Sequence, residues 1–270
     1  MTIHPTALIE DGAQIHPTAD IGPYCVVGPN VEIGAGTHLM SHVVVQNHTV
    51  LGEDNKIHPF ASVGGTPQDL KYEGEAAKLI IGNNNVIREG ATLNIGTSQG
   101  GGATRVGNDC LLMAYAHVAH DCILGDGVIL ANSVALAGHV TLGDHVILGG
   151  LAGVHQFCRI GRNAFVAAGG MAAQDVLPFS LVQGDRAQHV GINIIGLKRT
   201  GWDKATIMAV RTAFKRIFHS SGTREEALVH TEQTLAKECA PVREMCEFIR
   251  SAKRGICAAR VANGSGSDEA

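Results

Sequence analysis

An aliphatic residue stands at every sixth position over most of this chain of 270 residues, in the segments 3–63, 81–93 and 106–166. A period of six fits neither the 3.6-residue turn of a helix nor the two-residue alternation of a plain strand, but it fits a short strand followed by a corner. Three such units close one triangular coil, and successive coils stack at about 4.8 Å, the spacing of paired strands. The sequence therefore predicts a mainly β protein, a parallel β-helix of hexapeptide repeats.

The core of this rod must consist of aliphatic and small side chains, because aromatic residues make up only 4% of the chain whereas glycine occurs 34 times. A small or branched residue follows each of the early repeating aliphatics by four positions, where a corner leaves little room. Four of the seven cysteines take this position, and we interpret them as core spacers rather than ligands or nucleophiles. They are Cys25, Cys110, Cys122 and Cys158.

Cysteine spacing and hydropathy also bear on the compartment. The cysteines form no Cys-x-x-Cys pair, and the N-terminus does not resemble a charged-then-apolar signal peptide. No apolar run approaches the roughly 18 residues that cross a bilayer. These features predict a cytoplasmic protein that is kept reduced and does not insert into a membrane.

The repeat is interrupted twice and then ends. Residues near 64–80 break the period with glycine, proline and charge, and residues near 97–104 break it with a glycine-rich stretch. We interpret both segments as loops that project from the rod. Helical signals begin after residue 183: a possible cap at Asp203, a capping box of Thr223 and Glu226, and Pro241 at the start of a last helix that runs to about Arg254. We predict a β-helix over 1–190, an α-helical domain over 191–256 and a disordered tail over 257–270.

Charge is distributed unevenly along the chain. Residues 1–195 contain 8 Lys and Arg against 16 Asp and Glu, whereas residues 196–260 contain 13 against 7. The basic segment is either a solvated helical surface or a docking face for an acidic partner. Nucleic acid is not favoured as a partner, because the basic residues alternate with acidic ones and have no aromatic residues between them.

The stretch AHVAHDC, residues 116–122, places two histidines and an aspartate among the repeats. Residues 18 or 36 positions apart should lie above one another in a coil of three hexads. This rule gathers polar residues from three neighbouring columns on one edge of the rod, over about 10 Å. They are His120, Asp121, Gly138, His139, His155 and Gln156.

Three interpretations of this cluster are open from the residues alone. Each histidine could be a solvated corner residue. Three histidines from adjacent coils could hold zinc, but their spread along an edge suits a groove better than a metal site, and we expect no metal. A neutral imidazole could instead act as a general base, with His120 as the candidate, Asp121 orienting it if the pair lies at a corner, and the Gly138 N–H binding an oxyanion.

Several motifs closely resemble the UDP-N-acetylglucosamine O-acyltransferase family of lipid A biosynthesis. They are QDLKYEGE at 68–75, LLMAYAHVAHDC at 111–122, GGLAGVHQFC at 149–158 and GINIIGLKR at 191–199. The resemblance implies a left-handed β-helix and a homotrimer with active sites between neighbouring rods. It also implies transfer of a 3-hydroxyacyl chain from an acidic acyl carrier protein to the glucosamine 3-hydroxyl of the UDP-sugar, without a cofactor.

The resemblance further implies roles for particular residues. Catalysis falls to His120 as base, Asp121 as its orienting partner and Gly138 as oxyanion donor. Substrate binding falls to Gln68, Asp69, Lys71, His117, His139, His155, Gln156, Asn193 and Arg199. The length of the acyl chain is set near Ala168, in a column with Gly150, and the small residue there implies a fairly long chain. Arg211, Lys215 and Arg216, on one predicted helix, suit docking of the carrier protein.

The sequence also departs from relatives at certain positions. Asn94 and Ile95 stand where those relatives carry His-Arg, and Arg186, Ile195 and Thr200 stand where one has His, Glu and Arg. The acceptor is therefore either N-acetylglucosamine or its 3-amino analogue. The sequence leaves three further functions open: the sister N-acyltransferase of a later step, a zinc-dependent hexapeptide enzyme and a non-catalytic β-helical scaffold.

Overall fold

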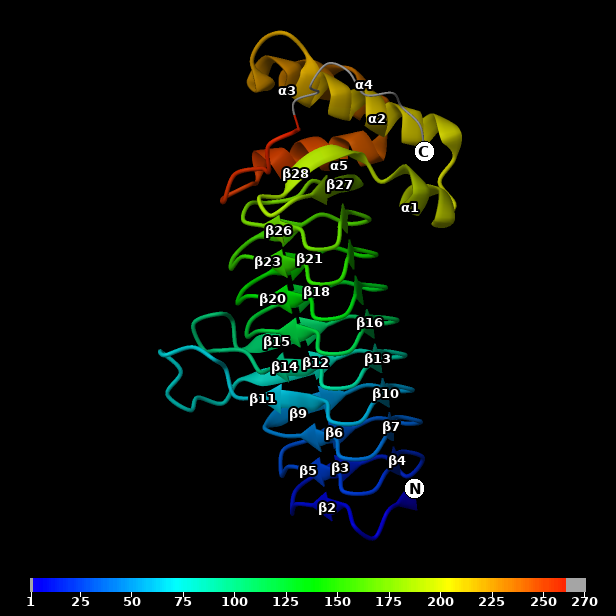
Figure 1. Ribbon diagram of the computed structural model, residues 1–270, viewed down its shortest axis with the longest axis vertical. Helices are drawn as coiled ribbons and strands as arrows, with labels where there is room; N and C mark the ends of the chain where they lie inside the picture. Colours follow the sequence, from blue (N-terminus) through cyan, green and yellow to red (C-terminus); the bar gives the residue numbers. More distant parts are fainter. Residues whose placement is uncertain (1, 261–270) are drawn as a thin grey trace.

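A computed structural model describes residues 2–260 as a tall three-sided rod with helices packed on its upper end (Figure 1). Each hexad forms a strand, usually of two residues, and strands three hexads apart along the chain pair in parallel. Three sheets result, one for each side of the rod. The fold is a left-handed parallel β-helix followed by α-helices, as predicted.

The chain passes through the three sheets in turn, first sheet 1, then sheet 2 and then sheet 3. Sheet 1 contains β1 (Thr2–Ile3), β4 (Asp20–Ile21), β7 (His38–Leu39), β10 (Lys56–Ile57), β13 (Val86–Ile87), β16 (Leu111–Leu112), β19 (Ile129–Leu130), β22 (Ile147–Leu148), β25 (Phe165–Val166), β27 (Ser180–Gln183) and β28 (Gln188–Ile192). Sheet 2 contains β2 (Leu8–Ile9), β5 (Val26–Val27), β8 (Val44–Val45), β11 (Ser62–Gly65), β14 (Thr92–Asn94), β17 (His117–Val118), β20 (Ala135–Leu136), β23 (Gly153–Val154) and β26 (Met171–Ala172). Sheet 3 contains β3 (Gln14–Ile15), β6 (Glu32–Ile33), β9 (His48–Leu51), β12 (Lys78–Ile81), β15 (Ala103–Val106), β18 (Ile123–Leu124), β21 (Thr141–Leu142) and β24 (Arg159–Ile160).

Register between coils shows where the rod is interrupted. Ile21 pairs with Leu39 at a separation of 18 residues, whereas Ile57 pairs with Ile87 and Ile87 with Leu112 at larger separations. The extra residues leave the rod between β11 and β12 and between β14 and β15, and both segments project to one side (Figure 1). These are the two outward loops, residues 66–77 and 95–102. The coils above and below them stay in line because the insertions are confined to the loops.

The repeating aliphatic side chains fill the interior of the rod. In nearly every two-residue strand the second residue points inward, and from β4 upward it is buried. Corners bring the chain around, and many corner residues take a positive φ although they are not glycine. Corner 1/2, between sheets 1 and 2, contains Tyr24 and Phe60, whereas corner 2/3 contains Asp121, His139 and Phe157. Corner 3/1 completes the triangle.

The helices form a second apolar core above the rod. They are α1 (Ile194–Arg199), α2 (Lys204–His219), α3 (Arg224–Gln233), α4 (Leu235–Glu238) and α5 (Ala240–Arg250). Asp203 caps α2, and Thr223 with Glu226 forms the predicted capping box of α3. The last helix ends at Arg250, short of the predicted end near Arg254. None of the helices within residues 2–260 is both long and apolar enough to cross a bilayer.

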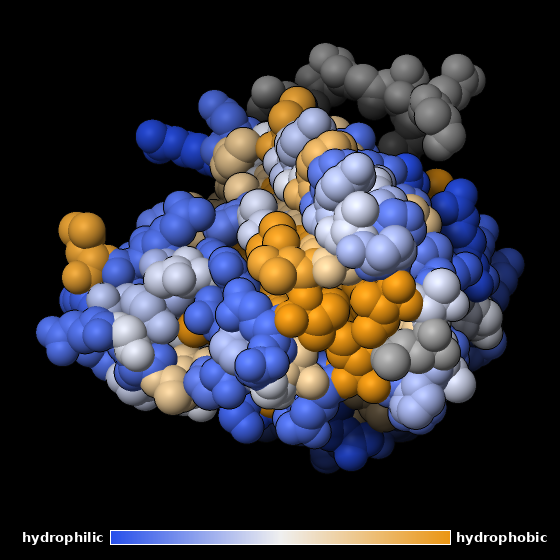
Figure 2. All heavy atoms as spheres, turned by 90° about the horizontal axis from the view of Figure 1, so that it is seen from below, coloured by the Kyte–Doolittle hydropathy of each residue, from blue (hydrophilic) through white to orange (hydrophobic). Residues whose placement is uncertain are grey.

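The two ends of the rod differ. Helices cover the upper end, whereas the first coil leaves Ile3, Ile9 and Ile15 only partly buried at the lower end. Figure 2, seen from below, shows apolar surface gathered at the centre of a largely hydrophilic face. Stacked strands expose unpaired backbone groups where a stack stops, so the helices protect one of two vulnerable edges.

The chain remains ordered past the tail boundary expected at residue 257. The Cys257 N–H donates to the Asp175 carbonyl, and residues Ala258 and Arg260 bond to the backbone of His189. The expected disorder is therefore wrong for residues 257–260, because this segment pairs with the top of the rod. The remainder of the expected tail, 261–270, lies outside the described residues.

The buried side chain of His189 holds residues 257–260 against the top of the rod. Its ring is fully buried; Nδ1 lies 2.9 Å from the Cys257 carbonyl oxygen and therefore donates, while Nε2 accepts from the Leu177 N–H at 3.2 Å. Burial lowers the pKa of His189 to about 4, because a charged ring has no access to water there. The neutral imidazole thus joins the last coil, β28 and the C-terminal segment.

We expect acid to destabilise the protein through His189. Between the ordinary imidazole pKa of 6.5 and about 4, the unfolded chain binds a proton that the folded chain excludes. The free energy of unfolding should therefore fall with decreasing pH in this window, by up to about 1.4 kcal/mol per pH unit. Urea unfolding across this pH range measures the slope. His189→Asn should flatten the slope and the exposed control His145→Asn should not; equal slopes in all three proteins would contradict the assignment.

Candidate active site

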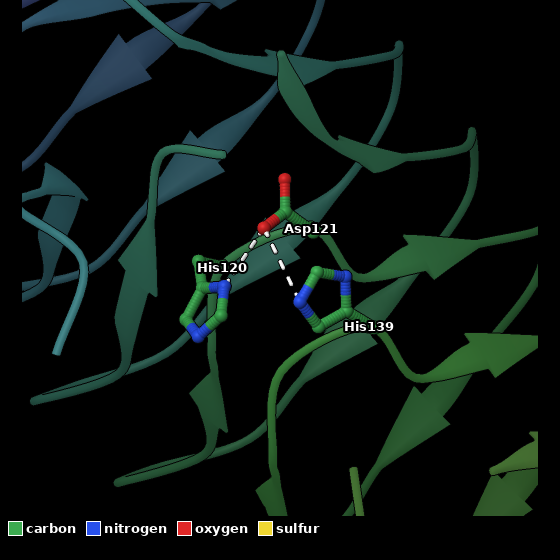
Figure 3. Close-up of side chains that lie close together, drawn as sticks. All are labelled: His120, Asp121 and His139. Carbon is green, nitrogen blue, oxygen red and sulfur yellow. Dashed lines mark hydrogen bonds and ion pairs between the residues drawn. The ribbon is translucent and has the colours of Figure 1, made fainter. Parts of the chain in front are cut away.

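The centre of the candidate site is a histidine–aspartate pair at corner 2/3. His120 Nδ1 lies 2.8 Å from Asp121 Oδ2, and the Asp121 side chain is fully buried (Figure 3). Adjacent residues of a strand would point to opposite faces, but Asp121 has a φ of 60° and turns the chain. The pair therefore lies at a corner, which is the condition that the hydrogen bond requires.

The buried carboxylate is held by further donors. Its Oδ1 accepts from the Thr97 N–H at 2.8 Å, and its Oδ2 accepts from the Thr97 hydroxyl at 2.7 Å. The Asp121 N–H donates to the Thr104 hydroxyl at 2.7 Å. Because an ionised carboxylate only accepts, the shared hydrogen of the pair belongs on His120 Nδ1. His120 Nε2 then carries a lone pair.

His139 approaches the same carboxylate from the next coil. Its Nε2 lies 3.8 Å from Asp121 Oδ2, and its ring stacks on Phe157 with centroids 4.4 Å apart and planes 9° apart. Burial lowers the pKa of His139; the neighbouring His120 acts in the same direction and Asp121 opposes it. Figure 3 shows the two imidazoles on either side of the aspartate.

A metal ion could in principle use the same three side chains, since one ligand atom of each of His120, Asp121 and His139 lies within 4.8 Å of the others. Zinc ligands sit about 2.0–2.2 Å from the metal, which separates them by over about 3 Å. The 2.8 Å between His120 Nδ1 and Asp121 Oδ2 is too short for two ligands of one zinc ion, and Asp121 Oδ2 already accepts two hydrogen bonds. The geometry suits a hydrogen-bonded pair.

Gly138 lies directly above His120. A Cβ built on Gly138 would come within 2.6 Å of His120 Nε2, so only glycine leaves room for the ring. The Gly138 carbonyl accepts from the Phe157 N–H, but within residues 2–260 the Gly138 N–H has no hydrogen-bond partner. A free donor and a free imidazole nitrogen therefore lie together.

A cleft of about 620 Å³ opens beside His120, between corner 2/3 and the two outward loops. It brings together six residues predicted from the sequence: Gln68, Asp69, Lys71, His120, His139 and Gln156. It also has four lining residues that the sequence analysis missed: Leu70, Thr97, Gln99 and Phe157. Phe157 could have been found, because it is 18 residues after His139, but the others depend on the loop conformations.

Two predicted histidines flank the cleft without lining it. His117 lies on the outer face of sheet 2, with Nδ1 2.7 Å from the Thr92 hydroxyl, and burial together with His120 lowers its pKa. His155 is exposed at corner 2/3, with Nδ1 3.1 Å from the Gln156 carbonyl oxygen.

Other predicted residues lie elsewhere in the chain. Gly150 and Ala168 are at corner 1/2, across sheet 2 from the cleft. Asn193 caps α1 and donates to the Asn163 carbonyl, and the exposed Arg199 ends α1, on the opposite side of the molecule from the outward loops (Figure 1). Arg211 and Lys215 are exposed on α2.

Five positions depart from relatives, and they differ in burial. Asn94 is buried; its Nδ2 donates to the Thr66 carbonyl and its Oδ1 has no partner within the described part of the chain. Ile95 is also buried. The other three are exposed on the upper part of the molecule: Arg186, Ile195 and Thr200.

Comparisons with known proteins identify the family. A family model described as UDP N-acetylglucosamine O-acyltransferase, domain 2, matches residues 175–257, and one for bacterial transferase hexapeptides matches residues 103–138. The acyl-[acyl-carrier-protein]–UDP-N-acetylglucosamine O-acyltransferase of an Anaeromyxobacter species is 49% identical over 95% of this chain and 99% of its own length. This chain belongs to the UDP-N-acetylglucosamine O-acyltransferase family. A curated protein of the same name from Myxococcus xanthus is also 49% identical, over 94% of this chain and 98% of its own.

Solved structures of UDP-N-acetylglucosamine O-acyltransferases extend the likeness to the fold. The Moraxella catarrhalis enzyme superposes with a TM-score of 0.91 at 46% identity, covering 95% of this chain and 99% of that one. The Arabidopsis UDP-N-acetylglucosamine acyltransferase has a TM-score of 0.83 at 36% identity, over 94% of this chain and 99% of that one. The whole rod and its helical cap thus follow the family.

The stacking of Phe157 on His139 generates a prediction. Phe157→Ala should expose the His139 ring to water and raise its pKa toward the ordinary value, because burial is the main cause that lowers it. Titration of ¹³C-labelled histidine rings by NMR measures the change. Phe60→Ala is a matched control, since Phe60 stacks on His42 at corner 1/2. An unchanged His139 titration in Phe157→Ala would contradict the prediction.

Proposed function

We propose that this chain transfers a 3-hydroxyacyl group from acyl carrier protein to the 3-hydroxyl of UDP-N-acetylglucosamine, the first step of lipid A biosynthesis. The single observation that carries the chemistry is the placement of His120, which lines the cleft with its Nε2 next to Gly138, whose N–H has no hydrogen-bond partner within residues 2–260. The names of the related acyltransferases indicate the two substrates, and they favour the hydroxyl acceptor over its 3-amino analogue. A non-catalytic scaffold would have no use for this arrangement.

The mechanism follows from the geometry of the pair. His120 Nε2 takes the proton of the sugar 3-hydroxyl while the oxygen attacks the thioester carbonyl carbon. The carbonyl oxygen becomes an oxyanion, which the Gly138 N–H binds. Collapse of the tetrahedral intermediate breaks the carbon–sulfur bond, and the imidazolium returns its proton to the leaving thiolate. Asp121 keeps the ring oriented and stabilises its charged form during the reaction.

The cleft residues suit the UDP-sugar. Lys71, on the outward loop, provides a positive charge for the diphosphate, while Asp69, Gln68 and Gln156 provide hydrogen-bonding groups for sugar hydroxyls and amide. His139 lies beside the base and completes the sugar site. His117 and His155 flank the cleft on its sheet 2 side and at corner 2/3, within reach of a longer substrate.

The faces of the rod support a homotrimer. Corner 1/2 carries large apolar side chains that are mostly exposed in a single chain: Tyr24 at 58%, Phe60 at 66%, Tyr115 at 70% and Leu151 at 68%. Above the outward loops, sheet 1 turns apolar residues outward, whereas the outward residues of sheet 3 alternate in character and include Arg105 and Arg159 beside the apolar Ile123. A three-fold axis along corner 1/2 would cover the apolar surfaces and leave sheet 3 in water.

Such a trimer would bring distant residues to the cleft. Sheet 1 of one copy would then face sheet 2 of its neighbour, which carries His117. Asn193 and Arg199 lie away from the cleft of their own chain, so they would serve a neighbour's site as contacts to nucleotide and acyl donor. The active site would therefore lie between rods.

The outer face of sheet 2 offers a path for the acyl chain. Ala135, Gly153 and Met171 point outward there, between the cleft and corner 1/2. The first two are small, so the face is smooth enough for an extended hydrocarbon. The path ends at Ala168, stacked above Gly150, and the small Ala168 side chain leaves room for a fairly long chain.

Carrier protein docking falls to the helical cap. Between α1 and α2 lies a groove lined by apolar residues, among them Trp202 and Met208, and by the basic residues Lys198, Lys204 and Arg211. Lys215 is one helical turn beyond Arg211, whereas Arg216 donates to the Thr234 hydroxyl. Basic groups around an apolar groove fit an acidic helical partner. We also propose a cytoplasmic location, supported by seven free cysteines.

Replacing the base tests the function. His120→Ala should lower acyl transfer at least about 100-fold, because general-base catalysis contributes that much or more. Purified protein is assayed with acyl carrier protein that carries acyl chains of several lengths. Light scattering measures whether the variant still forms a trimer. His145→Ala is the control, since His145 is an exposed histidine with positive φ at corner 3/1. Near-normal turnover in His120→Ala would refute the base assignment.

Charge reversal tests the docking surface. Arg211→Glu with Lys215→Glu should raise KM for the acyl carrier protein at least about tenfold and leave kcat at saturation nearly unchanged, because rim charges act mainly on encounter. Initial rates at varied carrier concentration and ionic strength measure both constants. Lys237→Glu, on α4, is the matched control. A KM and a salt dependence equal to those of the unmodified enzyme would contradict this assignment of the docking surface.

A further inference from the structure

Thr97 stands at the start of the second outward loop, between β14 and β15. It is 4% exposed, and both of its donors point at one group, the Asp121 carboxylate. It belongs to neither the hexad pattern nor the histidine column. A buried threonine that devotes its backbone N–H and its hydroxyl to one carboxylate is well placed to control that carboxylate.

The direction of each hydrogen bond is set by chemistry. The Gly100 N–H, which can only donate, lies 3.1 Å from the Thr97 hydroxyl oxygen. Thr97 therefore accepts from Gly100 and turns its own hydrogen toward Asp121 Oδ2. The same oxygen accepts the His120 Nδ1 hydrogen. A series of hydrogen bonds thus runs from the loop backbone through Thr97 to the Asp121 carboxylate, which also accepts from the base.

The loop backbone is pressed against the carboxylate. A Cβ on Gly100 would overlap the carboxyl group of Asp121, so this position has no space for a side chain. A second hydrogen bond, from the Gly102 N–H to the Thr97 carbonyl, closes the turn at 2.8 Å. Gly101 has a φ of 97°, and a Cβ there would meet no atom of residues 2–260 within 4 Å. Gly101 therefore serves the backbone of the loop, whereas Gly100 makes room for Asp121.

We propose that Thr97, held by the turn that contains Gly100, is a positioning residue for the His120–Asp121 pair. It touches no reacting atom; it acts by fixing the orientation of the carboxylate and by sharing its negative charge. This inference rests on the proposed acyl transfer and adds a third member to its hydrogen-bond relay. The turn of residues 97–102 is then part of the catalytic machinery as a support.

The hydroxyl of Thr97 has a predictable influence on the base. Without that donor, the Asp121 carboxylate concentrates its charge on the hydrogen bond to His120 and stabilises the protonated ring. Other charged or titratable groups around the pair are His139 from the next coil, His117 from sheet 2, and Asp69 and Lys71 from the first outward loop. All four are unchanged in a Thr97 variant, so a change in the pH dependence reports on the hydroxyl.

Thr97→Val removes the hydroxyl and keeps the branched shape and the backbone donor. We expect kcat to fall about 10- to 100-fold, KM for the UDP-sugar to change less than about threefold, and the acid limb of the kcat/KM profile to move to higher pH. Thr97→Ser should restore kcat and the limb. The proposal would be overturned if Thr97→Val kept the wild-type kcat and the wild-type acid limb. It would also be overturned if Thr97→Ser showed the same defects as Thr97→Val.

Gly100→Ala and Gly101→Ala separate contact from backbone strain. Both place alanine in the same turn, but only Gly100→Ala directs a methyl group into Asp121. We expect at least about a 100-fold loss of kcat for Gly100→Ala and less than about a tenfold loss for Gly101→Ala, with circular dichroism reporting folding. Similar losses in both variants would assign the effect to the loop backbone and overturn the role of Gly100.

A measurement without substrate distinguishes this inference from the proposed function. NMR of ¹³C-labelled histidine rings follows the pH at which the His120 ring takes up its proton. In Thr97→Val this pH should rise, and in Thr97→Ser it should match the unmodified protein, whether or not the chain acylates UDP-N-acetylglucosamine. A His120 titration identical in all three proteins would refute the relay, whereas an inactive unmodified enzyme would refute only the function.

Discussion

Backbone hydrogen bonding between successive coils is the constraint on which the rest of the molecule depends. It holds residues 18 positions apart nearly above one another, so one polar residue per coil is enough to build a column. At corner 2/3 the His139 N–H donates to the His120 carbonyl, and the Phe157 N–H donates to the Gly138 carbonyl. The three coils of the site are thereby fixed relative to one another before any side chain interacts. A rigid scaffold of this kind suits chemistry that needs a base and an oxyanion donor at a fixed separation.

The same winding gives each corner of the triangle a different set of side chains. Corner 1/2 collects exposed aromatic and aliphatic residues such as Tyr115 and Leu151, corner 2/3 collects the site, and corner 3/1 collects Asp and Asn side chains such as Asn108, which accept or donate between coils. Corner residues with positive φ cost free energy when they are not glycine, on the order of 1 kcal/mol each. The repeated hydrogen bonds of the coils offset this cost. Side chains at the corners are therefore free to serve assembly or catalysis, while the interior keeps its uniform aliphatic composition.

The sequence was sufficient to predict whatever depends only on the period. The rod, its projecting loops and the meeting of His120, Asp121 and Gly138 follow from counting in steps of 18. Handedness came from resemblance, because the period is the same for either hand. Thr97 was missed because the residues inserted between β14 and β15 take it out of register, and its place depends on a turn that includes Gly100. The sequence does not predict that residues 257–260 are structured, because the buried partner of their backbone is His189, which is far away in the sequence.

Burial of Asp121 links stability to chemistry. A carboxylate with no exposure to water loses several kcal/mol of hydration free energy, and it remains ionised only if donors replace the lost water. Thr97 provides two donors and His120 provides the third. The third donor requires that the imidazole hydrogen sit on Nδ1, which leaves the Nε2 lone pair beside Gly138. The hydrogen bonds that make the buried charge tolerable therefore also select the tautomer that a general base needs.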